Sequence, residues 1–453
     1  MPRAILVMLV LILAAPPAAL AGTVSLTSVG TDPKYPYEQP ALSFVAGPGE
    51  RNQIVLAQAL ASRPPAMIVA DAGAPVQAGA GCTAIDQHTA SCLAYYAYVD
   101  AGDGDDSVTV HPSVGFELHT RFNPYVRGGD GRDVLAGHGE LAGGPGDDVL
   151  SCSEPCEGSL LLGGAGSDVL RGGNGDDVLS GDGDGPPQLR VIDTVITESG
   201  PAGNDTIDGG GGRDRIRFDG RAAGVRVDLA AGTATGAAGD RDRLAGIEDA
   251  IGGDGDDILL GDGGANQLEG DAGDDRVAGR GGNDYLLGDL VPDTNDFSIT
   301  FTPGSDGADT LRGGLGDDVL DAGRERGDAF SGGPGADVLR NDLGGNMPAR
   351  SVRCGDGRDI VDFAPVGQRL TGCEQLRTAF GLRMAIRPQR RAGGRLRFAW
   401  TCQRGPACAI AIGVRVGSTK LARRRLRLAG RSSGAFLIRP ARAAGRGDVV
   451  DVT

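Results

Sequence analysis

Acidic residues recur at a nine-residue interval in the middle of the chain. The stretch GGDGDDILLGDGGANQLEGDAGDDRVAGRGGNDYLLGD, residues 252–289, divides into nonapeptides with Gly at positions 1 and 4, Asp or Asn at position 6 and an apolar residue at position 8. Carboxylates and backbone carbonyls are the oxygen ligands that calcium prefers. Carboxylates stacked at a strand spacing of ~4.8 Å repel each other unless a cation lies between them. The interval therefore indicates a row of cation sites.

The same nonapeptide recurs on both sides of this stretch. Four copies are degenerate: 101–109 and 354–362 lack the first Gly, 261–269 has Asn266 at position 6, and 323–331 lacks the second Gly. We interpret the aspartates at position 5 as solvated surface charge. Among the aspartates at position 6, Asp328 is the weaker candidate ligand because its turn lacks the second glycine. The candidate metal ligands are the aspartates at position 6: Asp133, Asp148, Asp168, Asp177, Asp205, Asp214, Asp257, Asp275, Asp284, Asp309, Asp318, Asp328 and Asp337.

This repeat resembles the RTX (hemolysin-type) calcium-binding nonapeptide G-G-x-G-x-D-x-U-x. The resemblance covers roughly residues 101–373. It implies an all-β fold, a parallel β-roll (a β-helix solenoid) with two nonapeptides per turn. It also implies calcium as the bound ion, held by turn carbonyls and the carboxylates at position 6.

Elementary geometry favours the same fold. Glycine-rich turns can adopt positive φ, and three-residue strands between them point position 8 inward. Stacking then buries columns of aliphatic side chains such as Leu259 over Val277 and Leu268 over Leu286, and brings Asp257 over Asp275. A solvated Gly/Asp linker, the alternative, has no need of an aliphatic residue at every ninth position.

The flanks of the roll predict further domains. Residues 1–21 are typical of a signal peptide, with Arg3, a short apolar run and the A-x-A-like site Ala19-Leu20-Ala21. The run is too short for a membrane anchor, and we expect no transmembrane span. We expect an N-terminal β cap over 22–100, the roll over 101–373, and a small, basic, β-sandwich-like domain over 377–453. The expected insertions in the roll are 183–199, 218–251 (hairpin-like) and 290–303.

Eight cysteines follow the predicted signal peptide. Export favours disulfides, whose connectivity the sequence leaves open. No C-x-x-C or Cys/His cluster favours zinc instead. The segment CGDGRDIVDF…LTGCEQL resembles the closing repeat of secreted actinobacterial repeat proteins, in which a disulfide seals the last turn. Nearest-neighbour pairing is the simplest arrangement: Cys82/Cys92, Cys152/Cys156, Cys354/Cys373 and Cys402/Cys408.

Charge is divided unevenly along the chain. Residues 377–453 hold 18 Lys+Arg against two acids, a net +16, so the remainder of a chain with net charge −16 carries −32. The run RRRLRL, 423–428, is interpreted as the outer face of an arginine-rich strand. An anionic polymer of the cell envelope is a possible partner for this basic domain, and we expect no nucleic acid.

Catalytic motifs are not convincing. Gly430-Arg431-Ser432-Ser433-Gly434 matches G-x-S-x-G, but no histidine follows His138, and there is no H-E-x-x-H. We therefore expect a secreted, extracellular calcium-binding β-roll protein, stabilised by calcium, that has a structural or surface role and is not an enzyme. The alternatives are a cell-surface adhesin or envelope component anchored by the basic domain and, less favoured, an exported hydrolase with an unrecognised site.

Overall fold

A computed structural model covers the chain and describes its side chains through most of residues 21–373. The predicted signal peptide lies outside the described residues except for Ala21, and of the C-terminal strands only the backbone is described. The described ranges up to the end of the roll are 21–29, 39–59, 64–114, 124–153, 158–184, 197–198, 203–218, 220–236, 240–289, 307–323, 327–341, 349–363, 368–373 and 375–377.

The chain separates into two compact units, an N-terminal module of residues 1–135 and a roll module of residues 136–453. The described residues of both modules form strands and turns and contain no helix. Accordingly, no helix long and apolar enough to cross a membrane occurs in the described part of the chain.

The N-terminal module contains two sheets. In the first, β1 pairs with β2 and β5, and β8 pairs in parallel with β2 and β10. In the second, β3 lies between β4 and the parallel strand β9, and β7 pairs with β4 and β6. The strands are β1 (Gly22–Val29), β2 (Gln39–Val45), β3 (Gln53–Ala59), β4 (Ala66–Asp71), β5 (Val76–Ala78), β6 (Cys82–Ala84), β7 (Thr89–Leu93), β8 (Tyr96–Asp100), β9 (Ser107–Val110) and β10 (Tyr125–Arg127).

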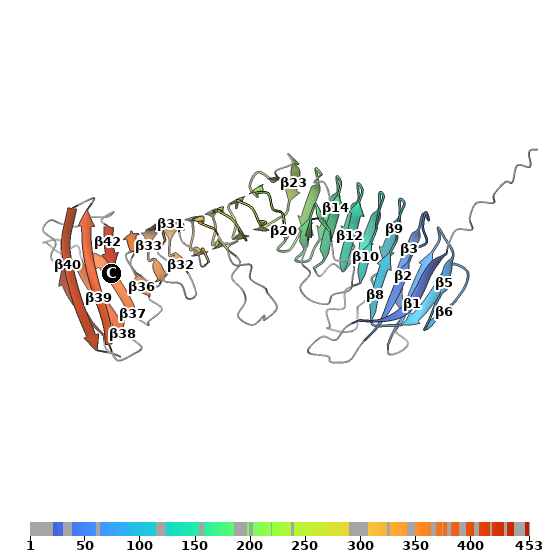
Figure 1. Ribbon diagram of the computed structural model, residues 1–453, viewed down its shortest axis with the longest axis horizontal. Helices are drawn as coiled ribbons and strands as arrows, with labels where there is room; N and C mark the ends of the chain where they lie inside the picture. The colour runs from blue at the N-terminus through green and yellow to red at the C-terminus, as the bar shows by residue number, and fades with distance from the viewer. Residues whose placement is uncertain are drawn as a thin grey trace, which may run out of the picture. The chain divides into compact units, whose positions relative to one another are not determined.

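Most strands of the roll module alternate between two parallel sheets, so that a strand pairs with the one that lies two nonapeptides away (Figure 1). The prediction of a parallel β-roll is confirmed. Sheet A contains β12 (Glu140–Pro145), β14 (Leu160–Ala165), β16 (Val178–Ser180), β20 (Arg215–Arg217), β24 (Asp249–Ile251), β26 (Gln267–Glu269), β28 (Tyr285–Leu287), β30 (Val319–Asp321), β32 (Val338–Asn341), β34 (Ile360–Phe363) and β36 (Gln375–Arg377). Sheet C contains β13 (Val149–Cys152), β15 (Val169–Gly173), β19 (Thr206–Gly210), β23 (Asp242–Ala245), β25 (Ile258–Leu260), β27 (Arg276–Gly281), β29 (Thr310–Leu315), β31 (Ala329–Gly335), β33 (Ser351–Gly357) and β35 (Gln368–Thr371).

Position 8 of each nonapeptide supplies the core. Leu259 pairs with Val277 in sheet C, and Leu268 pairs with Leu286 in sheet A. All four side chains are fully buried, as the stacking prediction requires. Between the strands, the glycine at position 4 turns the backbone: Gly273 has a φ of 116°, which side chains with a Cβ rarely tolerate.

The segment predicted as an insertion over 218–251 is part of the sheets. It does contain the expected hairpin, β21 (Arg226–Asp228) with β22 (Thr233–Thr235). However, β22 also pairs with β23, β23 pairs with β19, and β21 pairs with β25. Sheet C therefore runs through the hairpin without a break, and only its strand direction reverses locally.

The C-terminal strands continue both sheets in antiparallel order. β36 is followed in sheet A by β37 (Leu382–Pro388), β38 (Leu396–Cys402) and β41 (Ser433–Ile438). β35 is followed in sheet C by β42 (Val449–Val452), β39 (Ala407–Val416) and β40 (Thr419–Ala429). The side chains of these strands, including Cys402, Cys408 and the arginine run, lie outside the described residues, so the sandwich and its polymer partner stay predictions.

Candidate metal sites

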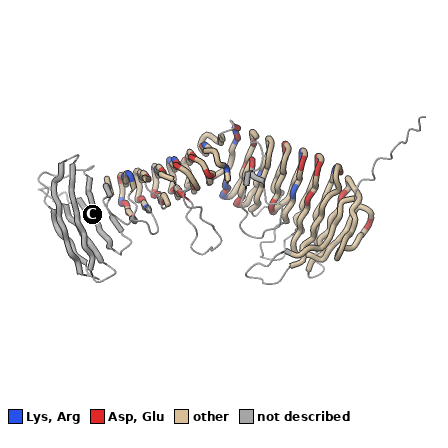
Figure 2. The backbone as a smooth tube through the Cα atoms, viewed as in Figure 1, with Lys and Arg blue, Asp and Glu red and all other residues tan. Residues whose placement is uncertain are grey.

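The aspartates predicted as ligands are all buried. Each of the thirteen predicted aspartates, from Asp133 to Asp337, is at most 2% exposed, although most of them follow a turn that contains exposed residues. Acidic residues recur at successive turns of the roll module (Figure 2). They form two columns, one that precedes strands of sheet A, such as Asp284 and Asp318, and one that precedes strands of sheet C, such as Asp257 and Asp275. Buried carboxylates need a hydrogen bond or a counter-ion to be tolerated.

One oxygen of each carboxylate is satisfied by the neighbouring turn. The Asp257 backbone N–H donates to Asp275 Oδ1 at 2.8 Å, and the Asp275 N–H donates to Asp309 Oδ1 at 3.0 Å. This places Asp257 next to Asp275, as predicted. The same bond recurs along both columns, in the pairs Asp106–Asp133, Asp148–Asp168, Asp168–Asp205, Asp177–Asp214, Asp309–Asp328, Asn266–Asp284, Asp284–Asp318 and Asp318–Asp337.

In most intact repeats the second oxygen lies beneath the glycine at position 1 of the same repeat, whereas Gly323 lies against Asp289 rather than Asp328. A Cβ added to Gly270 would collide with Asp275 Oδ2 and would lie 2.8 Å from the Gly288 carbonyl oxygen. The first glycine is thus required because its missing side chain leaves room for the carboxylate. The buried Oδ2 atoms that accept no hydrogen bond include those of Asp168, Asp205, Asp214, Asp275, Asp284, Asp318 and Asp337.

These oxygens fit a hard divalent cation. At Gly252, Gly270 and Gly313 an added Cβ would meet both a buried carboxylate oxygen and a glycine carbonyl oxygen, which is the donor chemistry that calcium takes. Within the described ranges, no three His, Cys, Asp or Glu side chains gather as a side-chain metal cluster. The donors available at a turn are therefore carboxylates together with backbone carbonyls.

Burial raises the pKa of these carboxyl groups. The pKa of Asp275 rises to about 9 and that of Asp205 to about 8, in both cases mainly because burial penalises the charged form. Neighbouring aspartates add to the shift, whereas the hydrogen bond from the adjacent turn opposes it. Without a cation, the buried carboxyl groups are neutralised by protonation, because the neutral form avoids the free-energy cost of burying a charge.

Three buried aspartates and one half-buried glutamate accept the same hydrogen bond although the consensus did not identify them. Asp106 and Asp359 occupy position 6 of the two repeats that lack the first glycine, and Asp242 accepts a 3.0 Å hydrogen bond from Asp205 N–H. Glu248 Oε2 accepts a 2.9 Å bond from Asp214 N–H after a turn of only two residues, Gly246 and Ile247. The longer glutamate side chain compensates for the shorter turn.

Two repeats begin earlier than their sequence suggested. The glycines that make room for the carboxylates of Asp205 and Asp309 are Gly181 and Gly288. The first glycines of 200–208 and 304–312, which the repeat alignment assigned to this role, lie outside the described residues. The predicted loops 183–199 and 290–303 therefore leave from inside a turn rather than between repeats, with β17 (Gly183–Asp184) and β18 (Thr197–Glu198) paired at the base of the first.

An aspartate clamps each of these interrupted turns. Asp182 Oδ1 accepts a hydrogen bond from Gly203 N–H at 2.8 Å, and Asp289 Oδ1 accepts one from Gly307 N–H at 3.2 Å. Both bonds tie position 2 of the repeat to position 4 across the loop. The turn thus closes in the same way whether or not a loop is inserted.

The position-5 side chains also have a role beyond the predicted surface charge. Asp256 Oδ1 accepts a 2.9 Å hydrogen bond from Asp274 N–H, and Asp274 Oδ1 accepts a 2.8 Å bond from Ala308 N–H. These bonds run in the opposite direction to those of position 6. Adjacent Asp-Asp pairs therefore tie a turn to both of its neighbours.

Asn266 accepts a backbone hydrogen bond within its own turn, as Asp257 Oδ2 does from Gly253 N–H, but its amide nitrogen is a donor that the aspartates lack. Its Oδ1 accepts a 2.9 Å hydrogen bond from Asp262 N–H, and its Nδ2 donates to the Glu248 carbonyl at 2.7 Å. The amide carries no charge, and its oxygen already has a donor. We therefore expect Asn266 to be the weakest cation ligand within residues 252–289.

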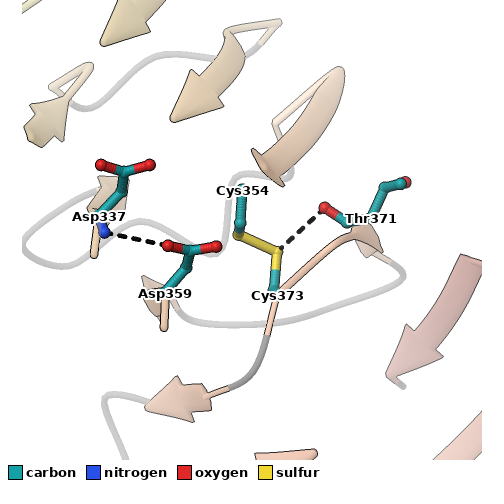
Figure 3. Close-up of a disulfide and its surroundings, with 5 residues drawn as sticks. All are labelled: Asp337, Cys354, Asp359, Thr371 and Cys373. Atoms are coloured by element: carbon teal, nitrogen blue, oxygen red, sulfur yellow. Dashed lines mark hydrogen bonds between the residues drawn. A yellow bond between two sulfur atoms is a disulfide. The ribbon is translucent and has the colours of Figure 1, made fainter. Parts of the chain in front are cut away.

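Two of the predicted disulfides are present. Cys82 is bonded to Cys92, and Cys354 is bonded to Cys373 beside the final carboxylates of sheet A, Asp337 and Asp359 (Figure 3). Cys152 is also disulfide-bonded, while its predicted partner, Cys156, lies outside the described residues. The second disulfide closes the end of the stacked repeats, as the resemblance implied.

Gly270→Ala should destabilise the roll. The new methyl group collides with the Asp275 carboxylate, so we expect a loss of about 1–3 kcal/mol in the free energy of unfolding. Gly263→Ala is the matched control, because a Cβ there has nothing within 4 Å. Chemical denaturation measures both; equal effects of the two substitutions would contradict the assigned role of position 1.

Stability without calcium should fall as the pH rises. Because the folded pKa values of Asp205 and Asp275, about 8 and about 9, exceed the ordinary value of 3.8, the folded state holds extra protons between these limits. The stabilisation is complete below pH ~4 and is lost towards pH 9. Thermal unfolding in chelator should give a lower Tm at pH 8 than at pH 5, and Asp275→Asn should weaken the dependence. A Tm that rises over this interval would refute the prediction.

Comparison with known proteins identifies the family of the repeat that forms these turns. A search of curated proteins found no match. The family model described as the RTX calcium-binding nonapeptide repeat matches in four copies, at residues 160–185, 199–220, 251–286 and 303–339. These segments contain the buried aspartates of both columns, including Asp168, Asp214, Asp275 and Asp318. The chain is therefore a protein that carries the RTX calcium-binding nonapeptide repeat.

Proposed function

We propose that the protein is a secreted, non-enzymatic calcium-binding β-roll that folds and is stabilised by extracellular calcium in a structural or surface role. The observation that supports this proposal best is the repeated buried Oδ2 atom that has no hydrogen-bond donor, such as that of Asp275. A polar atom of this kind is costly to bury unless it gains a partner. A divalent cation supplies that partner at many turns at once.

Calcium binding and folding would be coupled. The oxygens of a turn converge only when successive repeats are stacked, so the binding free energy becomes folding free energy. Extracellular calcium modules of ordinary affinity bind at about 10⁻⁴–10⁻³ M. The protein would therefore be loosely ordered where calcium is scarce and ordered after export.

We assign the ligands residue by residue as part of this proposal. They are the thirteen aspartates predicted from the sequence together with Asp106, Asp242 and Asp359, which are buried in the same way. Glu248 is the equivalent donor after the short turn that precedes β24. Disulfides in the described chain and the predicted signal peptide support an oxidising, extracellular location.

Calcium should increase the β structure of the chelated protein. We expect far-UV circular dichroism to show a cooperative gain of strand signal as calcium is added, because the cation neutralises the stacked carboxylates. Magnesium is the control ion: it demands near-octahedral geometry and dehydrates reluctantly, so it should act weakly. Absence of a gain, or equal responses to the two ions, would rule the proposal out.

Removing two stacked carboxylates should reduce calcium binding. The double substitution Asp257→Asn and Asp275→Asn keeps the side-chain shape and an acceptor oxygen. It removes two buried charges from the column of aspartates that precedes the strands of sheet C. The charge-matched control is Asp256→Asn with Asp274→Asn, which changes the exposed position 5 of the same turns. Calorimetric titration should show fewer calcium ions bound by the first variant only. An unchanged stoichiometry there would contradict the ligand assignment.

A further inference from the structure

A buried arginine lies where the column of aspartates in sheet C is interrupted. Upstream the column ends at Asp242, and downstream it resumes at Asp257, whose Oδ1 accepts a 2.7 Å hydrogen bond from Val225 N–H. Val225 thus stands at the place where other repeats have an acidic residue. Arg221, four residues earlier, is only 8% exposed.

The guanidinium of Arg221 joins two buried carboxylates. One terminal nitrogen, Nη1, donates to Asp240 Oδ2 at 2.9 Å, and the other, Nη2, donates to Asp182 Oδ2. The two acidic side chains are 1% and 2% exposed. Each also accepts a backbone hydrogen bond through its other oxygen, from Gly236 N–H and Gly203 N–H.

The backbone of Arg221 belongs to the downstream turns. Its carbonyl accepts a 2.8 Å hydrogen bond from Asp254 N–H, in the turn that leads to Asp257. Its side chain lies 5.3 Å from the ring centroid of Phe218, which is itself buried. A single residue therefore ties the turn at 252–257 to the turns of Asp182 and Asp240, across the reversed hairpin.

We propose that Arg221 is a built-in cation that replaces calcium at this interruption and keeps the middle of the roll ordered without metal. The inference rests on the proposed calcium-dependent folding of the remaining turns. Arginine suits the role because its guanidinium stays charged in proteins and presents donors to two carboxylates at once. The roll would then contain two arrays that fold only with calcium, upstream and downstream of a centre that stays ordered without it; Asp242, Glu248 and Asp257 in that centre keep their assignment as calcium ligands, but their turns do not need the ion to fold.

The calcium-independent centre has a direct signature in hydrogen exchange. In the full chain with chelator, amides of residues 215–257 should be protected, whereas those of 270–340 should exchange rapidly until calcium is added. Equal, rapid exchange of both segments in chelator would overturn the inference. If calcium protects no segment at all, the proposed function fails, while the protection of 215–257 in chelator still tests the built-in cation.

Arg221→Gln should remove this protection. Deleting one partner of a buried ion network leaves the others uncompensated, so we expect exchange of residues 215–257 in chelator to become at least ~10-fold faster. Arg226→Gln, on the adjacent strand β21 and half exposed, is the control. Identical behaviour of the two variants would overturn the proposal.

A compensated variant separates charge from packing. Adding Asp182→Asn and Asp240→Asn to Arg221→Gln removes the uncompensated charges and keeps groups able to form hydrogen bonds. We expect this triple variant to recover protection in chelator, even if the single variant fails to fold. A triple variant that stays as unprotected as Arg221→Gln would show that the guanidinium does not act through its charge.

Discussion

The burial of one carboxylate at most turns is the constraint on which the roll depends. A strand three residues long cannot form a core by itself, and stacking it brings the acidic side chain that precedes it into the interior as well. Glycine at position 1 provides the space, and the backbone N–H of the adjacent turn provides one hydrogen bond. What remains is an oxygen such as Asp275 Oδ2, and its neutralisation decides whether the stacked state is stable.

Much of this arrangement follows from residue spacing alone. Position 8 predicted the buried columns that contain Leu259 and Leu268, and position 6 predicted which aspartates lie in adjacent turns. Both predictions depend on a strict period, since a stacked repeat allows each position only one environment. The consensus succeeded wherever the period was intact.

Elsewhere the structure uses the same chemistry with a different spacing, and spacing could not reveal it. Glu248 reaches from a shortened turn, and Gly181 serves Asp205 from across an inserted loop. The spacing predicts only surface charge for the position-5 aspartates, because it does not reveal their hydrogen bonds to the backbone of the next turn. In each of these three cases, the length of the side chain and the path of the backbone determine which groups meet, and residue type alone does not show either. Where position 6 is not acidic, side-chain N–H groups of Asn266, at that position, and of Arg221, four residues before Val225, bond to oxygens of other turns.

The aspartate clamps at Asp182 and Asp289 have a consequence for how such a chain can vary. Each clamp closes its turn independently of what lies between positions 2 and 4. The entropy cost of a loop grows slowly with its length, about 0.6 kcal/mol for each doubling. The register of the stacked strands therefore does not depend on the number of residues inserted at these two turns. In evolutionary terms, a clamped turn is a position at which a loop can be inserted, lengthened or replaced while the stacked strands stay unchanged.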